Sequence, residues 1–160
     1  MRTPINNVPI FPLSTVLYPE GVLSLRVFEP RYLDMVSACL KEDRPFGVCL
    51  IAEGAEVGPV AKCFQVGTLA KIINWNQSTD GILEVETVGC QRFRLLKSEV
   101  TKQNLIVGDI QLLNDSPPVT LPNEFASLVI TLKNVINHSS SSVTTNEESF
   151  NDPNWVSYRL

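Results

Sequence analysis

Apolar and polar residues alternate along much of the first two thirds of the chain, which is the pattern of half-buried β-strands. The alternation is clear over residues 22–27 and extends over residues 63–76. The apolar run of residues 46–51 has the length of a buried strand. Asp80-Gly81 predicts a hairpin turn, because glycine tolerates a positive φ.

The strand that follows this turn begins at residue 82. Gly89 predicts a bulge or bend within it, after which residues 92–96 resume the strand. A further strand is predicted over residues 105–113, and a short apolar run over residues 8–11 opens the chain.

Apolar residues spaced three and four apart mark two helices. Pro30 suits the first turn of the first helix, whose stripe consists of Tyr32, Met35, Val36, Cys39 and Leu40. The segment at residues 43–45 ends it. The second helix begins at Pro122, with a stripe formed by Phe125, Leu128, Val129, Leu132, Val135 and Ile136.

The last part of the chain is polar. Residues 138–149, rich in serine, threonine and asparagine, predict a mobile loop, and Asp152-Pro153 predicts a helix start. The chain stops at Leu160, within three turns, and so short a helix is marginal alone. Two interpretations stay open: the helix docks on the strands, or the helical portion is incomplete here and the natural protein continues.

These elements predict an α+β fold that is mainly β. We expect a twisted sheet of antiparallel strands closed into a small barrel, with one inserted helix and helical material at the end. The β domain is predicted over residues 1–116, and the start of a helical region over residues 117–160.

Composition and charge limit the classes of function that fit this sequence. The chain is 44% hydrophobic and 19% charged, enough for a core without metals or disulfides. Its four cysteines form no C-x-x-C pair, which predicts reduced, buried thiols. The net charge of -4 argues against nucleic acid, whose binding depends on lysine and arginine. No signal peptide or membrane-length apolar run is present, so we expect a cytoplasmic protein.

The opening of the chain carries a family pattern. Residues 8–21, VPIFPLSTVLYPEG, resemble the start of the Lon protease amino-terminal domain family, and residues 23–36, LSLRVFEPRYLDMV, are similar to its strand-to-helix junction. Residues 66–72, the Asp80-Gly81 turn and residues 89–95 fit its later strands. The resemblance is specific in the first block and weakens after residue 113.

The resemblance implies a PUA-like pseudo-barrel followed by a helical bundle. It also implies a substrate-recognition role, since in Lon proteases this domain helps to capture unfolded or tagged substrates. The ATPase and the serine–lysine peptidase lie in later domains, and stand-alone bacterial proteins of this type exist. The implied partners are unfolded or extended polypeptide segments and a separate protease or chaperone, with no cofactor.

Catalytic patterns are missing from the sequence. A phosphate-binding loop requires G-x-x-x-x-G-K-[ST], whereas residues 54–59, GAEVGP, have the wrong spacing and no lysine. Ser14, Ser24 and Ser37 have no lysine or histidine partner by pattern, and the single histidine, His138, lies far from the cysteines. The sequence therefore predicts neither an enzyme nor a metal site.

Charged residues on the strands allow two interpretations. Glu84 and Glu86 lie on one face, about 7 Å apart, a spacing compatible with acid–base chemistry but typical of any solvated strand. Arg92 and Arg94 form a small basic strip, or pair with these glutamates.

The candidate binding residues are an ion pair and a set of aromatics. Glu29 and Arg31 flank Pro30, where they serve the helix entrance or form the rim of a peptide groove. Trp75 precedes the hairpin turn and is placed to stack on a ligand or to cover the mouth of the barrel. The remaining candidates are Phe11, Tyr18 and Tyr32. For Phe11 and Tyr18, as for Phe28, we expect packing in the core or in a turn rather than a place in a ligand site.

Three functions follow from these observations. The leading hypothesis is a polypeptide-binding module with an apolar groove or an exposed strand edge. A nucleic-acid-binding domain would need a contiguous basic face, and a small-ligand domain would need a deep pocket with convergent polar groups.

Overall fold

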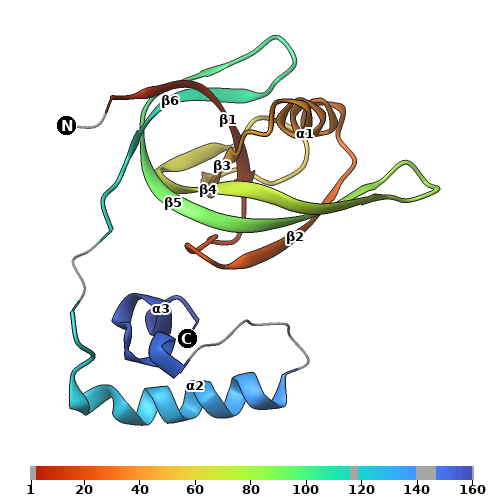
Figure 1. Ribbon diagram of the computed structural model, residues 1–160. Helices are drawn as coiled ribbons and strands as arrows, with labels where there is room; N and C mark the ends of the chain where they lie inside the picture. Colours follow the sequence, from red (N-terminus) through yellow and green to blue (C-terminus); the bar gives the residue numbers. More distant parts are fainter. Residues whose placement is uncertain (1–2, 116–118, 140–146, 160) are drawn as a thin grey trace. The chain divides into compact units, whose positions relative to one another are not determined.

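The structure, a computed structural model, describes residues 3–115, 119–139 and 147–159. It divides into two compact units, residues 1–114 and residues 115–160 (Figure 1). No helix in the described ranges is long and apolar enough to cross a membrane.

The first unit is built on a six-stranded sheet with the order β2-β5-β4-β3-β1-β6. The strands are β1 (Ile5–Leu13), β2 (Val22–Val27), β3 (Phe46–Glu53), β4 (Lys62–Gln77), β5 (Leu83–Val100) and β6 (Ile106–Leu112). Helix α1 (Pro30–Glu42) connects β2 to β3. The predicted α+β, mainly β fold with an inserted helix is thereby confirmed.

One pair of neighbouring strands runs parallel. β1 lies beside β3 with Ile10 opposite Gly47 and Leu13 opposite Leu50, whereas the other pairs are antiparallel. The chain travels from β1 to β3 through β2 and α1, the kind of long crossover that parallel strands require. The expectation of antiparallel strands is wrong for this pair, because the pattern within a strand does not reveal the direction of its neighbour.

Strand β5 is shared by three partners. It pairs with β2 and β4 over its first part, and from Phe93 to Val100 it pairs with β6. The register between β4 and β5 shifts between Thr68 and Ala70, opposite Arg92 and Gly89, which confirms the predicted irregularity near Gly89. Closure of the sheet into a PUA-like pseudo-barrel remains a prediction.

Helix α1 begins and ends where the sequence predicts. Pro30 occupies its first turn, and Tyr32, Met35 and Val36 turn their side chains into the core. Asp43 then adopts the left-handed conformation, with φ 47° and ψ 47°, and its amide donates to the carbonyl of Cys39. Such a residue after the last turn satisfies free carbonyls and ends the helix.

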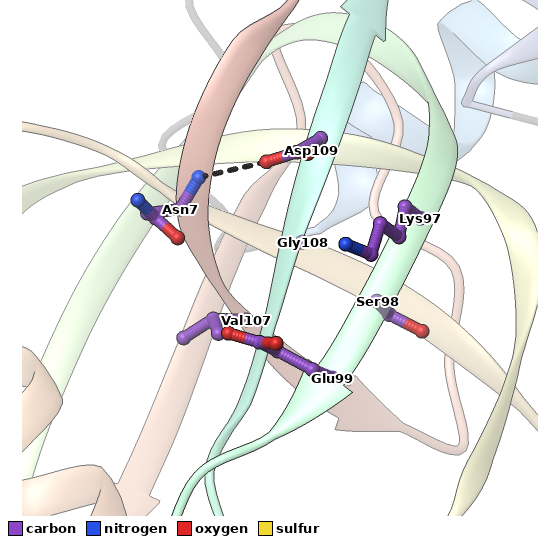
Figure 2. A pocket seen from close by; sticks show the side chains of 7 residues that line it. All are labelled: Asn7, Lys97, Ser98, Glu99, Val107, Gly108 and Asp109. Carbon is purple, nitrogen blue, oxygen red and sulfur yellow. Dashed lines mark hydrogen bonds between the residues drawn. The ribbon is translucent and has the colours of Figure 1, made fainter.

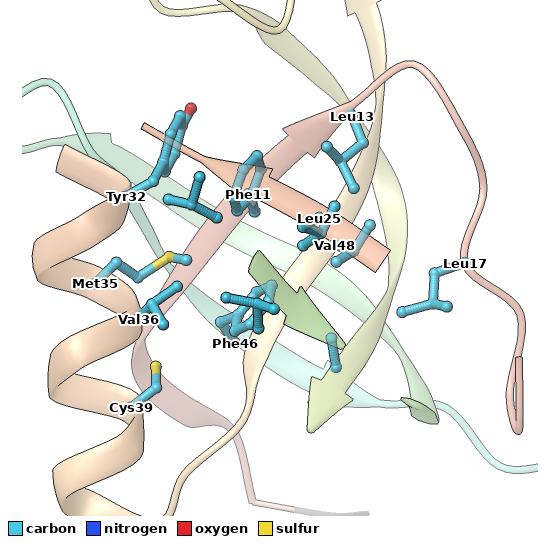
Figure 3. Close-up of a cluster of buried hydrophobic side chains, with 13 residues drawn as sticks. Phe11, Leu13, Leu17, Leu25, Tyr32, Met35, Val36, Cys39, Phe46 and Val48 are labelled. Carbon is cyan, nitrogen blue, oxygen red and sulfur yellow. The ribbon is translucent and has the colours of Figure 1, made fainter. Parts of the chain in front are cut away.

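Two apolar clusters form the core of the first unit. The larger lies between α1 and the strands, and Figure 3 shows Met35, Val36 and Cys39 of α1 facing Phe46. The smaller surrounds Phe93, which is fully buried. A Cβ at Gly67 would lie 2.6 Å from the Phe93 ring, so this glycine allows β4 to approach the ring.

The second unit is helical. It contains the 3-10 helices η1 (Asn123–Phe125) and η2 (Glu147–Asn151) and the helices α2 (Ala126–His138) and α3 (Pro153–Ser157). Its core is formed by Leu132, Phe150, Trp155 and Val156.

The predicted helix start at Asp152 is confirmed, because its side chain accepts a hydrogen bond from the Asn154 amide at 2.9 Å. The loop predicted over residues 138–149 is wrong at its ends. His138 closes α2 by a 2.7 Å contact from its Nδ1 to the carbonyl of Asn134, and Glu147 begins η2. Residues 140–146 lie outside the described residues.

Candidate functional site

Strand β2 has a free edge. Among the described residues it pairs only with β5, from Val22 opposite Val88 to Val27 opposite Leu83. Figure 1 shows β2 along the margin of the sheet, beside β5. An unpaired edge offers backbone donors and acceptors to another chain.

The direction of the β2 backbone groups follows from the hydrogen bonds at its start. The amide of Gly89 donates to the carbonyl of Gly21 at 2.8 Å, and the carbonyl of Gly89 accepts from the amide of Glu20 at 2.8 Å. Glu20 and Gly21 thus form a bulge opposite Gly89, and the Gly21 carbonyl points toward β5. Hydrogen-bonded and non-bonded pairs alternate along an antiparallel ladder. The amides and carbonyls of Val22, Ser24 and Arg26 therefore point away from β5, toward the free edge.

The hairpin at the start of β5 independently gives the same direction for the backbone groups of β2. In the β4–β5 hairpin the amide of Ser78 donates to the carbonyl of Ile82 at 2.9 Å. Alternation from this pair directs the backbone groups of Glu84 and Glu86 to β4, and those of Val85 to β2.

A hollow of about 230 Å³ adjoins this edge. It is lined by Phe11, Leu13, Ser24, Leu25, Arg26, Val27, Phe28, Glu29, Tyr32, Glu56 and Val57. These residues come from the end of β1, from β2, from the start of α1 and from the loop between β3 and β4.

Aromatic side chains form the floor of the hollow. The rings of Phe11 and Tyr32 are stacked, with centroids 4.1 Å apart and an interplanar angle of 10°. Figure 3 shows the two rings side by side, with Leu25 close by. All three residues belong to the larger core cluster, so the floor is rigidly supported from below.

Two large apolar side chains stand at the walls. Phe28 is 52% exposed and Val57 is 54% exposed, although both line the hollow. The wall that carries Val57 is tied to the end of β1, because the Ser14 amide donates to Glu56 Oε1 at 2.6 Å. The hollow therefore exposes the apolar side chains of Phe28 and Val57 to solvent, beside polar lining residues such as Ser24, Arg26 and Glu56.

Arg31 contacts several of the segments that surround the hollow, although it does not line the hollow itself. It is 8% exposed, and its guanidinium donates to the carbonyls of Gly58 at 2.8 Å and Asn104 at 3.0 Å. It also forms an ion pair with Glu29 at 3.0 Å and lies 4.7 Å from the centre of the Tyr32 ring. This one side chain thus fixes the Val57 wall, the Glu29 rim and the aromatic floor.

The Tyr32 hydroxyl stays neutral over the ordinary pH range. Burial raises the pKa of Tyr32, partly offset by the positive charge of Arg31. A neutral phenol both donates and accepts hydrogen bonds. The floor therefore offers one polar atom without a charge.

A second hollow, of about 440 Å³, lies along β2, β5 and β4 and shares Ser24, Leu25 and Arg26 with the first. Trp75, which is 54% exposed, lines it together with Glu84 and Glu86. Across the β2–β5 pair, Glu86 is opposite Ser24 and Glu84 is opposite Arg26.

Other hollows lie away from this edge. One of about 70 Å³ opens around Gly108 where the register shifts on both sides of β6, and Figure 2 shows Asn7 donating to Asp109 beside it. Another, of about 320 Å³, lies between α1 and the turn that joins β5 to β6 and includes Met35 and Leu105.

The four cysteines differ in burial. All four are free thiols, and Cys39 and Cys49 are buried as the sequence predicts, whereas Cys63 and Cys90 are half-buried. Burial raises the pKa of Cys49 to about 12, with a smaller effect of Cys63, and a protonated thiol is a poor nucleophile. In the ranges that the structure describes, no three His, Cys, Asp or Glu side chains gather to hold a metal ion.

The sequence-derived candidates divide into groups. Phe11, Glu29 and Tyr32 line the first hollow, and Trp75 lines the second. Arg31 does not line the first hollow; it lines the hollow of about 320 Å³ and contacts Glu29 and Tyr32. Tyr18 lies apart, in the turn that precedes β2, where its carbonyl accepts from the Gly21 amide at 3.0 Å.

Sequence reasoning did not single out the walls as binding residues. Phe28 directly follows an alternating strand, and Val57 lies in a loop bounded by glycines. These two positions were the signal in the sequence that both side chains are exposed. Their shared location was not readable, because it depends on how the β3–β4 loop folds back over Arg31.

Comparison with known proteins gives a consistent picture. The model of the ATP-dependent protease La (LON) substrate-binding domain matches residues 7–158. The crystal structure of a Lon N-terminal domain protein from Xanthomonas campestris is similar, with a TM-score of 0.78 and 31% identity, covering 98% of this chain and 81% of that one.

Longer relatives match over the same region. Lon protease 1 of Hydrogenovibrio crunogenus is 29% identical over 119 residues, which are 74% of this chain and 14% of that protein. Protein cereblon of Xenopus tropicalis is 27% identical over 126 residues, 76% of this chain and 26% of that protein. The chain spans only a small part of these relatives.

Proposed function

We propose that this chain, which belongs to the family of ATP-dependent Lon protease substrate-binding domains, is a non-catalytic module that binds extended or unfolded polypeptide segments. One observation carries the proposal. The backbone groups of Ser24 and Arg26 point to the free edge of β2, and both residues line a hollow that has an aromatic floor and mixed polar and apolar walls. A segment that pairs with this edge gains main-chain hydrogen bonds and buries apolar side chains at the same time.

This mode of binding suits a protein that must accept many sequences. Main-chain hydrogen bonds do not depend on the side chains of the bound segment. In this proposal Phe11 and Tyr32 contact apolar side chains, Glu29 forms a rim, and Arg31 positions the walls. Trp75 contacts a segment that continues into the second hollow, and Tyr18 holds the turn that orients β2.

The proposal assigns no reaction to this chain. In this proposal a bound segment is passed to a separate protease or chaperone; the family's description as a substrate-binding domain of an ATP-dependent protease supports the protease. The four free thiols suit a reducing compartment, which supports a cytoplasmic location.

The experiment compares two ligands and two variants. A permanently unfolded, reduced and alkylated protein and a single-stranded RNA are titrated against the full chain at physiological salt. We expect binding of the unfolded protein and none of the RNA, because the chain carries a net charge of -4. Binding of RNA alone, with steep salt dependence, would contradict the proposal.

Ser24→Pro then tests the strand edge. Its amide points away from β5, so proline removes an outward donor and leaves the β2–β5 ladder intact. The loss of one hydrogen bond, worth about 1 kcal/mol, weakens binding of the unfolded protein at least about fivefold. Ser24→Ala, which keeps the amide, serves as the matched control and should bind as the parent does.

A further inference from the structure

Two arginines on one face of β5 have no acidic partner. Arg94 is exposed and lies opposite Val66 in the register with β4, and Arg92 is half-buried two residues before it. Among the described residues neither arginine forms an ion pair, so the interpretation that pairs them with Glu84 and Glu86 is wrong. The Nε of Arg92 is buried without a hydrogen-bond partner. This face therefore carries two positive charges that no ion pair neutralises in the described part of the chain.

Three exposed apolar side chains accompany Arg94. Val66 lies directly opposite it, with Phe64 two residues before Val66 and Leu96 two residues after Arg94. Side chains alternate along a strand, so all of them lie on the same face, and antiparallel pairing places Phe64 and Leu96 at the same end. Between 43% and 53% of each of the three apolar residues is exposed. We call Phe64, Val66, Arg94 and Leu96 the β4–β5 patch.

The other charges on this face offset one another. Lys97 lies opposite Asp109 in the register with β6, and Lys62 forms an ion pair with Glu53 at 2.8 Å. The charge that is left over is that of the two arginines, in a chain whose net charge is -4. A partner that covers the β4–β5 patch is therefore complementary when it brings carboxylates together with apolar side chains.

The sheet offers no free edge at the β4–β5 patch. β4 pairs with β3 and β5, and β5 pairs at this level with both β4 and β6. A partner that cannot add a strand has to bind through its side chains. An amphipathic helix does so, because it presents an apolar stripe flanked by charged residues.

From these observations we propose that the β4–β5 patch docks an acidic amphipathic helix of another protein. The apolar stripe of that helix covers the three exposed apolar side chains, and its carboxylates pair with Arg92 and Arg94. Exposed apolar side chains rimmed by charged residues are typical of such interaction surfaces.

The β4–β5 patch is separate from the free edge of β2. That edge pairs with residues 83–88 of β5, whereas the arginines of the patch begin at Arg92. The inference therefore does not rest on strand addition, and Ser24→Pro should leave the binding of the helix unchanged. A chain that binds at both places joins a captured polypeptide segment to the partner that receives it.

Three helical peptides of about 14 residues test the chemistry of the partner against the full chain. The first has a leucine stripe at positions i, i+3, i+4 and i+7, with glutamate and alanine elsewhere. The second has the same composition with the leucines spread around the helix, and the third replaces each glutamate by lysine. We expect the first to bind about tenfold more tightly than either of the others, because it alone brings leucines and carboxylates to the patch together.

Four variants test the location of the site. Arg94→Glu should weaken binding of the first peptide about five- to tenfold, because an exposed attraction becomes a repulsion. Lys102→Glu is the matched control, since it reverses an exposed charge about 20 Å away along β5. Leu96→Ser should weaken binding about fivefold, whereas Val100→Ser, which changes a residue of similar exposure on the same strand, should not. Far-UV circular dichroism shows that each variant is folded.

The outcomes also identify other occupants. Absent or equal binding of the three peptides, or equal losses in Arg94→Glu and Lys102→Glu, would overturn the inference and leave the proposed function as it stands. Binding of single-stranded RNA that Arg94→Glu abolishes would assign the arginines to phosphates and overturn it as well. Self-association that Leu96→Ser abolishes, without peptide binding, would assign the patch to a second copy of the chain, again against the inference.

Discussion

Replacing Arg31 by alanine should destabilise the first unit strongly. The change removes two hydrogen bonds to the carbonyls of Gly58 and Asn104 and the ion pair with Glu29. A hydrogen bond from a charged donor contributes about 1.5–3 kcal/mol, and breaking a buried ion pair costs about 3–5 kcal/mol. These contributions share one guanidinium and are not additive.

We expect Arg31→Ala to lower the free energy of unfolding by about 3 kcal/mol, the lower end of that range. The Glu29 side chain is 18% exposed, so water can solvate its carboxylate after the arginine is removed. With a urea dependence of about 2 kcal/mol per molar, the unfolding midpoint should fall by about 1.5 M. Far-UV circular dichroism during urea titration measures this, since the sheet belongs to the first unit.

Two further variants sharpen the test. Arg31→Lys keeps the charge but cannot span both carbonyls, so we expect about half of the loss and weaker polypeptide binding through a loosened Val57 wall. Arg44→Ala removes an exposed ion pair with Glu42 and should cost less than about 1 kcal/mol. An Arg31→Ala midpoint indistinguishable from that of Arg44→Ala would refute the assignment of Arg31 as the residue that holds the site together.

Other expected outcomes follow from the core and the helix end. Asp43→Gly should raise the free energy of unfolding by about 0.5–1 kcal/mol in chemical denaturation, because Asp43 has φ 47° and glycine adopts this conformation freely. A decrease would show that the Asp43 side chain stabilises the fold by more than its backbone conformation costs. Gly67→Ala should lower it by about 1–3 kcal/mol, because the new Cβ would lie 2.6 Å from Phe93; an unchanged melting temperature would contradict the packing. Stability should fall as the pH rises from about 9 toward 12, because burial raises the pKa of Cys49 above its unfolded value and the thiolate forms first in the unfolded chain. Cys49→Ala should flatten that decline, and an unaltered alkaline profile would show that Cys49 does not cause it.

Local chemistry made many elements predictable from the sequence. Strand β2 has the alternation that marks it, α1 begins at the proline that its first turn tolerates, and the turn at Asp80 and Gly81 has Gly81 at φ 82°. Each of these features depends on residues within a few positions of one another.

Long-range features were not predictable. The parallel pairing of β1 with β3 and the double use of β5 depend on where distant segments meet. The site shows the same division. Phe11 and Tyr32 were recognisable as aromatic candidates, but their stacking and the reach of Arg31 to Gly58 and Asn104 arise only in the folded chain.

Amide hydrogen exchange of β2, resolved by residue, tests the account most directly. The amides of Leu23 and Leu25 bond to β5 and should be protected with or without ligand, whereas those of Val22, Ser24 and Arg26 point outward and should exchange quickly in the free chain. Saturation with a permanently unfolded protein should slow exchange at these three positions selectively. Unchanged exchange at Val22, Ser24 and Arg26 in the saturated complex would contradict strand addition at the β2 edge.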